Sequence, residues 1–138
     1  MNTLTATLAV ALALATHTQA AEQPDKGLAS LISDVASAAD RKDYEALYEL
    51  MIEEFRYSFG GERSKDQAIE WYKNRPELLV RLGAVLSGDC AFFEADKTLH
   101  YVCPAAAVSS DTPFYEYRAG FRLKDGNLWE FVWFIAGD

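Results

Sequence analysis

The spacing of apolar residues along this chain changes from the period of a helix to the period of a strand. Two groups recur at the spacing of one helix face and predict two helices, namely Leu28, Leu31, Ile32 and Val35, then Tyr44, Leu47, Tyr48 and Met51. Asp43 is placed to cap the second helix. The period then becomes two, so residues 55–59 predict a strand, which Gly60 and Gly61 end.

Two capping sequences predict helices in the middle of the chain. The sequence SKDQ at 64–67 is a capping box, and NRPE at 74–77 is a looser one with proline near the first turn. Two helices, or one kinked helix, are therefore expected from Ser64 to Leu86. Gly88 ends this helical run, and strands are expected to follow it.

The two cysteines of the chain stand at the ends of a predicted β-hairpin. Residues 90–94 and 99–103 read as its strands, so Cys90 and Cys103 lie near its open end. In an oxidising compartment this pair is expected to form a disulfide, which stabilises the fold by about 3 kcal/mol in chain-entropy terms. A redox role is disfavoured because the cysteines lack CxxC spacing. Residues 104–113 are expected to form a loop.

Residues 114–138 predict a second hairpin, which is rich in aromatic side chains. A two-residue turn at Asp125 and Gly126 pairs Lys124 with Asn127 and so sets the register of the strands. One face of this hairpin is then expected to line the core or a pocket. It carries Tyr115, Tyr117, Ala119, Phe121 and Leu123, opposite Ala136, Phe134, Val132, Glu130 and Leu128.

The other face of the hairpin is expected to point outward, with each arginine opposite a tryptophan. It carries Glu116, Arg118, Gly120 and Arg122, opposite Ile135, Trp133, Phe131 and Trp129. A mixed aromatic and arginine surface is typical of protein interfaces, and three large aromatic side chains on one exposed face are unusual for a monomer. The candidate interface residues are therefore Arg118, Arg122, Trp129, Phe131 and Trp133.

Helices precede antiparallel strands in this order of elements, which predicts an α+β fold with N-terminal helices packed on an antiparallel sheet. The composition, 50% apolar and 25% charged, is that of an ordinary globular protein. The length that remains after residue 20 is enough for one domain with one core. We expect a linker at 21–27 and a single domain at 28–138.

The first 20 residues have the pattern of a secretory signal peptide. They hold no acidic residue, an apolar run from Leu4 to Ala15 that is too short to span a bilayer, and the small-x-small site Thr18-Gln19-Ala20. Cleavage is expected after Ala20, and no cysteine stands at the new N-terminus to carry a lipid anchor. The sequence therefore predicts a soluble exported protein, periplasmic or secreted, with no membrane contact after cleavage.

The net charge of −8 disfavours some classes of partner. All 13 basic and 21 acidic residues lie after residue 20, so the mature chain keeps this charge and is repelled by nucleic acids and anionic membranes. A basic protein partner is compatible with it. No dinucleotide-binding, phosphate-cradling or nucleophile motif occurs, so no cofactor is predicted.

His100 is the only histidine after the cleavage site. It stands on the strand face opposite Leu99 and Tyr101, and a histidine can act as a general base near neutral pH. The favoured interpretation is a partly exposed strand residue, because the sequence links no acid or nucleophile to it. No metal site is predicted, since a typical zinc site needs three or four ligands.

The order of elements, together with RKDYEAL at 41–47, FRYSFGG at 55–61 and GNLWEFVWFIAGD at 126–138, resembles the nuclear transport factor two-like (cystatin-like) superfamily. The resemblance covers nearly all of the chain after residue 20 and implies a curved sheet wrapped around helices to form a cone. The family includes ketosteroid isomerase, scytalone dehydratase, polyketide cyclases and many proteins without catalysis. YSFGG and WFIAGD are also similar to secreted bacterial proteins of unassigned function, and the fold alone assigns no activity.

The favoured hypothesis is an exported, non-catalytic binding or association module. It holds a small apolar ligand in the cone, or forms a homodimer through the outer sheet face. Its candidate pocket residues are Tyr48, Tyr57, Tyr117, Phe121 and Phe134. One alternative is an isomerase, dehydratase or cyclase with an acid-base site in the cone, using His100 with Tyr48 or Tyr57. A second alternative is a periplasmic inhibitor or immunity protein that binds a basic effector.

Overall fold

The computed structural model of the chain describes residues 23–109 and 111–137, so the signal peptide expected at residues 1–20 lies outside the described residues. The helices and strands follow one another in the expected α+β order, with one short helix added. They are α1 (Lys26–Asp40), α2 (Tyr44–Leu50), β1 (Met51–Arg56), α3 (Lys65–Lys73), α4 (Glu77–Ser87), β2 (Ala91–Ala95), β3 (Thr98–Cys103), α5 (Ala106–Ser109), β4 (Arg118–Leu123) and β5 (Trp129–Ile135).

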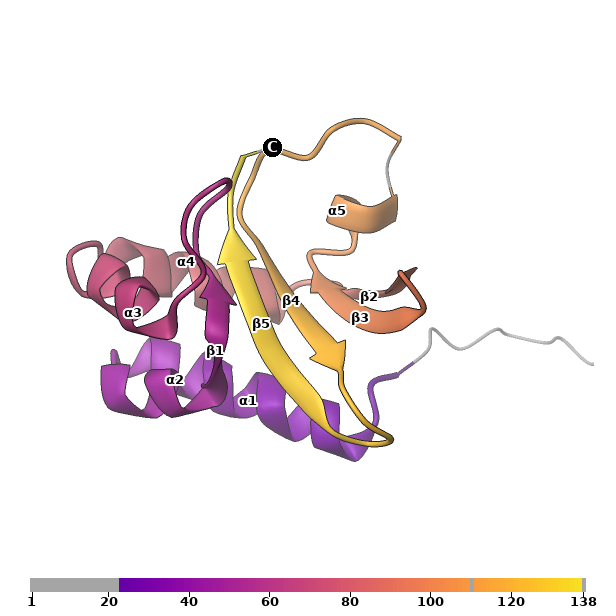
Figure 1. Cartoon of the computed structure of the whole chain (residues 1–138), viewed down its shortest axis with the longest axis horizontal. Coiled ribbons are helices and arrows are strands. Elements are labelled where there is room, and N and C mark those ends of the chain that lie inside the picture. Colours follow the sequence, from indigo (N-terminus) through magenta and orange to yellow (C-terminus); the bar gives the residue numbers. More distant parts are fainter. Residues whose placement is uncertain (1–22, 110, 138) are drawn as a thin grey trace, which may run out of the picture.

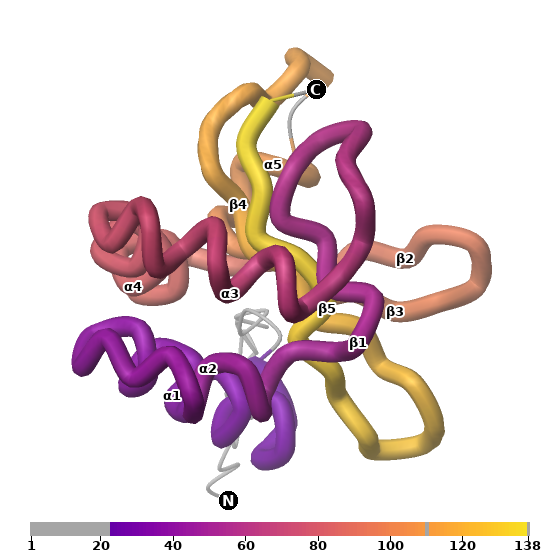
Figure 2. Tube along the Cα trace, turned by 60° about the vertical axis from the view of Figure 1, so that its left-hand side comes forward, coloured from indigo at the N-terminus to yellow at the C-terminus, as the bar shows by residue number. Residues whose placement is uncertain are grey.

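The strands form one five-stranded sheet in the order β1-β5-β4-β3-β2. Four of them pair antiparallel as expected, but β1 runs parallel to β5, so the sheet is mixed. The sheet twists and curves strongly, and α1 and α4 pack against each other and against β5 and β4 (Figure 1). Helices α1 to α4 gather on one side, while the β2–β3 hairpin and the tip of the β4–β5 hairpin project on the other (Figure 2). The cone-like α+β class is thus confirmed.

Local hydrogen bonds explain where three helices begin. The carboxylates of Asp25 and Asp43 accept backbone N–H groups in the first turns of α1 and α2, at 2.8 and 3.1 Å. Ser64 does the same for α3, accepting the N–H of Gln67 at 3.3 Å, as the capping box predicts. The return bond of the box is absent among the described residues, because the Gln67 side chain instead accepts the Tyr57 hydroxyl at 2.8 Å.

Four details of the expected elements differ from the structure. Met51 is expected on the second helix but opens β1, because its backbone is already extended. Strand β1 ends at Arg56 and does not continue to residue 59. Helix α4 begins after Pro76 without a side-chain cap, so the looser capping sequence marks the helix start but supplies no capping bond. The expected loop at 104–113 contains α5.

The core fills the space between the helices and the inner face of the sheet. Phe131 lies at its centre, with ring centroids 4.8 Å from Phe55 and 5.2 Å from Phe121. The buried hydroxyl of Tyr72 donates a hydrogen bond to the carbonyl oxygen of Phe134 at 3.1 Å, which joins α3 to β5. The interior of the cone is therefore packed with aromatic side chains.

The register expected for the terminal hairpin is wrong by one residue at its tip. The N–H of Lys124 donates to the carbonyl oxygen of Leu128 at 2.8 Å, so the loop has three residues, with Gly126 at φ +55°. Consequently Phe121 pairs with Phe131, and Leu123 pairs with Trp129. A shift of one residue turns every side chain of a strand to the other face.

This shift places Trp129 and Phe131 in the core, where 8% and 1% of their surface is exposed. The two-residue turn predicts both on the outer face, and this prediction is wrong. The reason is the length of the turn: Asp-Gly favours a two-residue loop, but the chain here forms a three-residue loop, the next most common kind. The outward aromatic stripe therefore loses two of its three members.

A β-bulge in β5 then returns the residues that follow it to the faces expected for them. Phe121 pairs with Phe131 while Gly120 pairs with Trp133, so Val132 is the extra residue between them. Beyond the bulge Trp133 lies on the outer face and covers Gly120, the position that the expected register gives to Phe131. Arg118 lies across from Ile135 and not from Trp133, so the interface argument built on an Arg118–Trp133 pair loses its basis.

The β2–β3 hairpin confirms the expected disulfide between Cys90 and Cys103, whose Cα atoms are 4.3 Å apart. Its turn consists of Asp96 and Lys97, both with positive φ, at 50° and 64°. This geometry is that of a two-residue hairpin turn that matches the twist of the strands. Within the described part of the chain, none of the helices is both long and apolar enough to cross a membrane.

Candidate functional site

Two adjoining grooves lie on the outer face of the sheet, the face turned away from α1 and α4. The first, which we call the arginine groove, has a volume of about 440 Å³ and is lined by Ile52, Glu54, Arg56, Arg63, Ala95, Asp96, Thr98, His100, Arg122, Val132 and Trp133. The second, the apolar groove, has a volume of about 380 Å³ and is lined by Phe93, Ala95, His100, Val102, Ala107, Val108, Arg118 and Trp133. Trp133 and His100 belong to both, so the two grooves form one continuous site.

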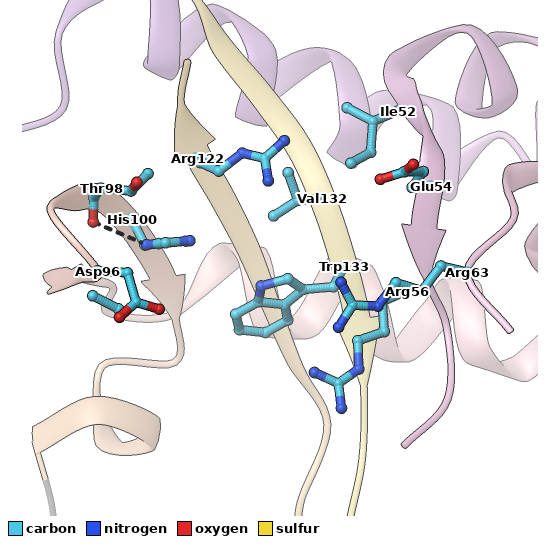
Figure 3. A pocket seen from close by; sticks show the side chains of 11 residues that line it. Ile52, Glu54, Arg56, Arg63, Asp96, Thr98, His100, Arg122, Val132 and Trp133 are labelled. Atoms are coloured by element: carbon cyan, nitrogen blue, oxygen red, sulfur yellow. Dashed lines mark hydrogen bonds between the residues drawn. The ribbon is translucent and has the colours of Figure 1, made fainter. Parts of the chain in front are cut away.

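Trp133 occupies the centre of this site, with Arg56 and Arg63 on the β1 side and His100 on the β3 side (Figure 3). The ring lies directly over Gly120: a Cβ built at that position would be 2.1 Å from Cε2 of Trp133. The absence of a side chain at Gly120 is therefore what allows the indole to lie against the sheet. The bulge at Val132 and the glycine together set the position of the ring.

Arg56 and Arg63 are brought together by the loop that follows β1. The backbone N–H of Ser64 donates to the carbonyl oxygen of Phe55 at 3.1 Å, which turns the loop back along the strand. Partial burial, and then the charge of Arg63, lower the pKa of Arg56. Within residues 23–109 and 111–137, neither arginine forms an ion pair. The Arg56 guanidinium lies over the ring of Phe59, 4.5 Å from its centroid.

Arg122 is the third arginine of the groove, and it forms an ion pair with Glu130. Its guanidinium donates to the carboxylate of Glu130 at 2.8 Å, and the ammonium of Lys124 lies 3.6 Å from the same carboxylate. Arg122 and Glu130 are directly opposite each other on β4 and β5. The expected outer-face position of Arg122 is correct, but its neighbour across the ladder is this acid rather than Trp129.

Arg118 stabilises the backbone on either side of the terminal hairpin. Its guanidinium donates to the carbonyl oxygens of Phe114 and Gly137, at 2.7 and 2.8 Å, and so ties the segment before β4 to the end of the chain. It lines the apolar groove from one end. Of the expected interface residues, Arg118, Arg122 and Trp133 therefore line the outer-face site, while Trp129 and Phe131 do not.

His100 lies where the two grooves meet, with its Nδ1 3.2 Å from the carbonyl oxygen of Thr98. The two tyrosines expected to act with it are elsewhere. Tyr57 donates to Gln67 beside α3, and Tyr48 donates to Asp66 at 2.6 Å, a bond that raises the pKa of Tyr48 to about 12. The structure does not bring His100 together with either tyrosine, so the acid-base constellation of the enzyme hypothesis is not assembled.

The pocket expected inside the cone is occupied by its own side chains. Phe121 and Phe134 have no exposed surface. Tyr117, which is partly buried, packs on Phe134 with ring centroids 4.9 Å apart. Tyr48 and Tyr57 make the surface hydrogen bonds described above. The five candidate pocket residues thus belong to the core and to the α3 surface, and the structure corrects that prediction.

Two parts of the outer-face site were not predicted from the sequence. Arg63 stands in a loop with no periodicity, and only the loop's turn back onto β1 places it beside Arg56. Helix α5 supplies Ala107 and Val108 as one wall of the apolar groove, yet four residues are too few for a helical period to be visible. The alternation along β1 does place Arg56 on the face opposite Phe55, which was the available signal. Among the described residues, no group of three or more His, Cys, Asp or Glu side chains could hold a metal ion.

Comparison with known proteins gives likenesses of fold. No family model and no curated protein matches the chain. It is similar to an NTF-2 like protein of unknown function from Shewanella oneidensis MR-1, with 18% identity, a TM-score of 0.46, and coverage of 84% of this chain and 100% of that one. It is also similar to an NTF2-like protein with a cystatin-like fold from Novosphingobium aromaticivorans, with 19% identity, a TM-score of 0.42, and coverage of 79% and 77%.

Proposed function

We propose that this protein is an exported, non-catalytic binding module that uses the outer face of its sheet as the binding surface. The observation that carries this proposal is the continuous pair of grooves around Trp133, where a fixed aromatic ring lies between charged and apolar walls. Binding sites in proteins are commonly concave, largely apolar, and fitted with a few placed polar groups. On the outer face the apolar groove supplies the apolar wall and the arginine groove the polar groups, whereas the interior of the cone is filled.

The positions of the acid-base candidates support a role without catalysis. A general base needs a partner within hydrogen-bond reach, and His100 makes its nearest polar contact with a backbone carbonyl oxygen. The Tyr48–Asp66 pair does meet that distance, but the hydrogen bond raises the pKa of Tyr48 from 10.0 to about 12, so the phenol gives up its proton less readily than an ordinary tyrosine. Neither group is set up for proton transfer.

Export is part of the proposal and rests on two features. The N-terminal sequence has the signal-peptide pattern, and the Cys90–Cys103 disulfide suits an oxidising compartment. Fractionation of expressing cells tests it: the chain should be recovered outside the cytoplasm with a new N-terminus at Ala21. Recovery of a cytoplasmic protein that keeps its first 20 residues would contradict export.

A fragment screen on the mature chain tests the location of binding. Ligands should shift the NMR signals of residues around Trp133, and Trp133→Leu should abolish those shifts. Trp71→Leu is the matched control, because Trp71 is also partly buried but belongs to α3, outside both grooves, with the Arg75 guanidinium 4.1 Å from its ring centroid. Ligands that bind equally well to Trp133→Leu, or that perturb the surface around Trp71 alone, would refute an outer-face binding surface.

A further inference from the structure

We infer that the outer-face site binds a small organic anion with a flat, apolar body. Its acid group lies between Arg56 and Arg63, and its ring stacks on Trp133 towards the apolar groove. This inference rests on the outer-face binding function proposed above and names the class of ligand. Three independent observations support it: the charges of the arginine pair, the fixed position of the indole, and the apolar wall next to it.

The first observation is that two cations are held side by side without a counter-charge. The chain as a whole carries a net charge of −8, yet Arg56 and Arg63 lie together and form no ion pair within the described residues. Partial burial disfavours the charged form of Arg56, and the neighbouring charge of Arg63 adds to this. A bound carboxylate removes the repulsion and accepts charge-assisted hydrogen bonds from both guanidinium groups.

The other charged residues of the groove leave this pair available. Arg122 is occupied by Glu130 at 2.8 Å. Asp96 stands on the far side of Trp133, next to His100, and Glu54 lies two residues before Arg56 on β1 (Figure 3). The positive end of the groove is therefore the β1 end, and an anion placed there keeps Trp133 between itself and Asp96.

The second observation concerns the indole ring of Trp133. Because it lies on Gly120 at a distance that a Cβ would not permit, one face of the ring is packed against the sheet. The ring still lines both grooves, so its other side faces the ligand space. An aromatic surface that is already fixed loses little conformational entropy when a ligand stacks on it.

The third observation is that the surface beyond Trp133 is mainly apolar. The apolar groove is lined by Phe93, Val102 and Val108, and Phe93 is 44% exposed. A ligand that extends from the arginine pair across the indole reaches this surface and removes it from water, which stabilises the complex. Inorganic phosphate would use the arginine pair alone, so the apolar wall favours an organic acid.

Binding of 2-naphthoate and of its neutral analogue 2-naphthamide to the mature chain tests this inference. The two probes share the same bicyclic ring and differ in charge. We expect naphthoate to shift the indole N–H signal of Trp133 and the amide signals of β1, and to bind about tenfold more tightly than naphthamide, as the loss of charge-assisted hydrogen bonds implies. Inorganic phosphate at the same concentration should compete weakly.

Arg63→Gln should weaken naphthoate binding about tenfold and leave naphthamide binding unchanged. Arg63 is exposed, so this variant keeps the fold, and an unchanged melting temperature checks that. Arg81→Gln is the matched control, since Arg81 is an exposed arginine on α4, outside both grooves. Equal effects of the two substitutions would overturn the assignment of the arginine pair.

The outcomes separate the ligand class from the binding surface. If naphthamide and naphthoate bind the outer face equally well, the anion inference fails and the binding function stands. If both probes, and the fragments that bind Trp133, give signals only away from the outer face, both proposals fail. If the Trp133 signals change with protein concentration and sedimentation gives a dimer, a second copy occupies the face and the inference is overturned.

Discussion

At the scale of single residues, Gly120 has more influence on the outer face than any charged residue of the site. It is covered by Trp133, which would be 2.1 Å from a Cβ at that position. A side chain there forces the indole off the sheet, and the two grooves that share this ring change shape together. The absence of a side chain at Gly120 thus sets the position of the ring that both grooves share.

Gly120→Ala is therefore expected to destabilise the fold by about 1–3 kcal/mol, the usual cost of overpacking. The near-ultraviolet circular dichroism signal should change as well, because the indole is displaced. Gly83→Ala is the control: Gly83 lies inside α4, and a Cβ built on it would have no neighbouring atom within 4 Å, so alanine should stabilise the helix by about 1 kcal/mol. Urea denaturation of both variants measures the two changes in stability, and equal midpoints would contradict this prediction.

Asp25 is a second residue whose environment makes a measurable prediction. The backbone N–H of Leu28, and then the indole N–H of Trp129, hold the pKa of Asp25 below its ordinary value of 3.8. A depressed folded pKa means that this carboxylate stabilises the fold above pH 3.8, and that the stabilisation is lost as the pH falls through the folded pKa.

Trp129→Phe should raise the pKa of Asp25 towards 3.8 without reaching it, because the stronger bond from Leu28 remains. An NMR titration of the Asp25 carboxyl carbon measures this directly. The melting temperature of the variant should also lose part of its dependence on pH in the acid range. An unchanged Asp25 pKa would show that the Trp129 bond has no weight in solution.

At the scale of elements, the disulfide links the start of β2 to the end of β3, next to the segment that forms α5. It joins residues that are 13 positions apart. Closing a loop of this size removes chain entropy from the unfolded state worth about 3 kcal/mol. The Cys90→Ala, Cys103→Ala double variant should lose this stability and keep the same fold. Urea denaturation of wild type under reducing conditions is the control, and it should match the double variant.

Most elements were predictable, but the pairing between distant ones was not. Periodicity and capping residues such as Asp43 and Ser64 located α1 to α4, and the hairpins followed from turn residues. The parallel contact of β1 with β5 joins residues about 80 positions apart, for example Met51 and Phe131, and no local pattern reports it. The same pairing sets Arg56 opposite Trp133, and the loop after β1 then brings Arg63 to the site.

The outer-face residues show how the length of one turn changes the pairing of a whole strand. The turn at Asp125 has one residue more than expected, so Trp129 and Phe131 are core residues. The bulge at Val132 then returns Trp133 to the expected outer face. The residue types in this strand do not predict the position of the bulge. The presence of aromatic and arginine side chains was predictable, while the register decides which of them meet.

At the scale of the whole molecule, the burial of Trp129 and Phe131 changes the expected state of association. The apolar surface left on the outer face comes chiefly from Trp133 and Phe93, which is less than the three-aromatic stripe that argued for a homodimer. We therefore expect a monomer in sedimentation experiments. A dimer that Phe93→Glu dissociates, while Val80→Glu leaves it intact, would restore the homodimer hypothesis; Val80 is an exposed apolar residue on α4, outside both grooves, at 68% against 44% for Phe93.

Part of the acidic character of the molecule lies around Tyr48. Glu49, Glu53 and Asp66 are near its ring, and Lys65, 3.3 Å from Glu53 and 4.1 Å from the Tyr48 ring centroid, offsets one of their three charges. The inhibitor hypothesis stays a prediction. It would require a neighbouring basic protein whose binding is lost when these acids are neutralised.

The bulge at Val132 has a consequence for how this hairpin tolerates change in length. Phe131 faces the core, Val132 and Trp133 face outward, and Phe134 faces the core again. Removing the codon for Val132 would leave a strand that still alternates, so the hydrophobic pattern on which folding depends would survive. Trp133 would also keep its place, because Phe131 would still pair with Phe121 and the next residue, Trp133, with Gly120. Deletion of this one codon would therefore leave the indole on Gly120 and remove only the Val132 side chain from the wall of the arginine groove.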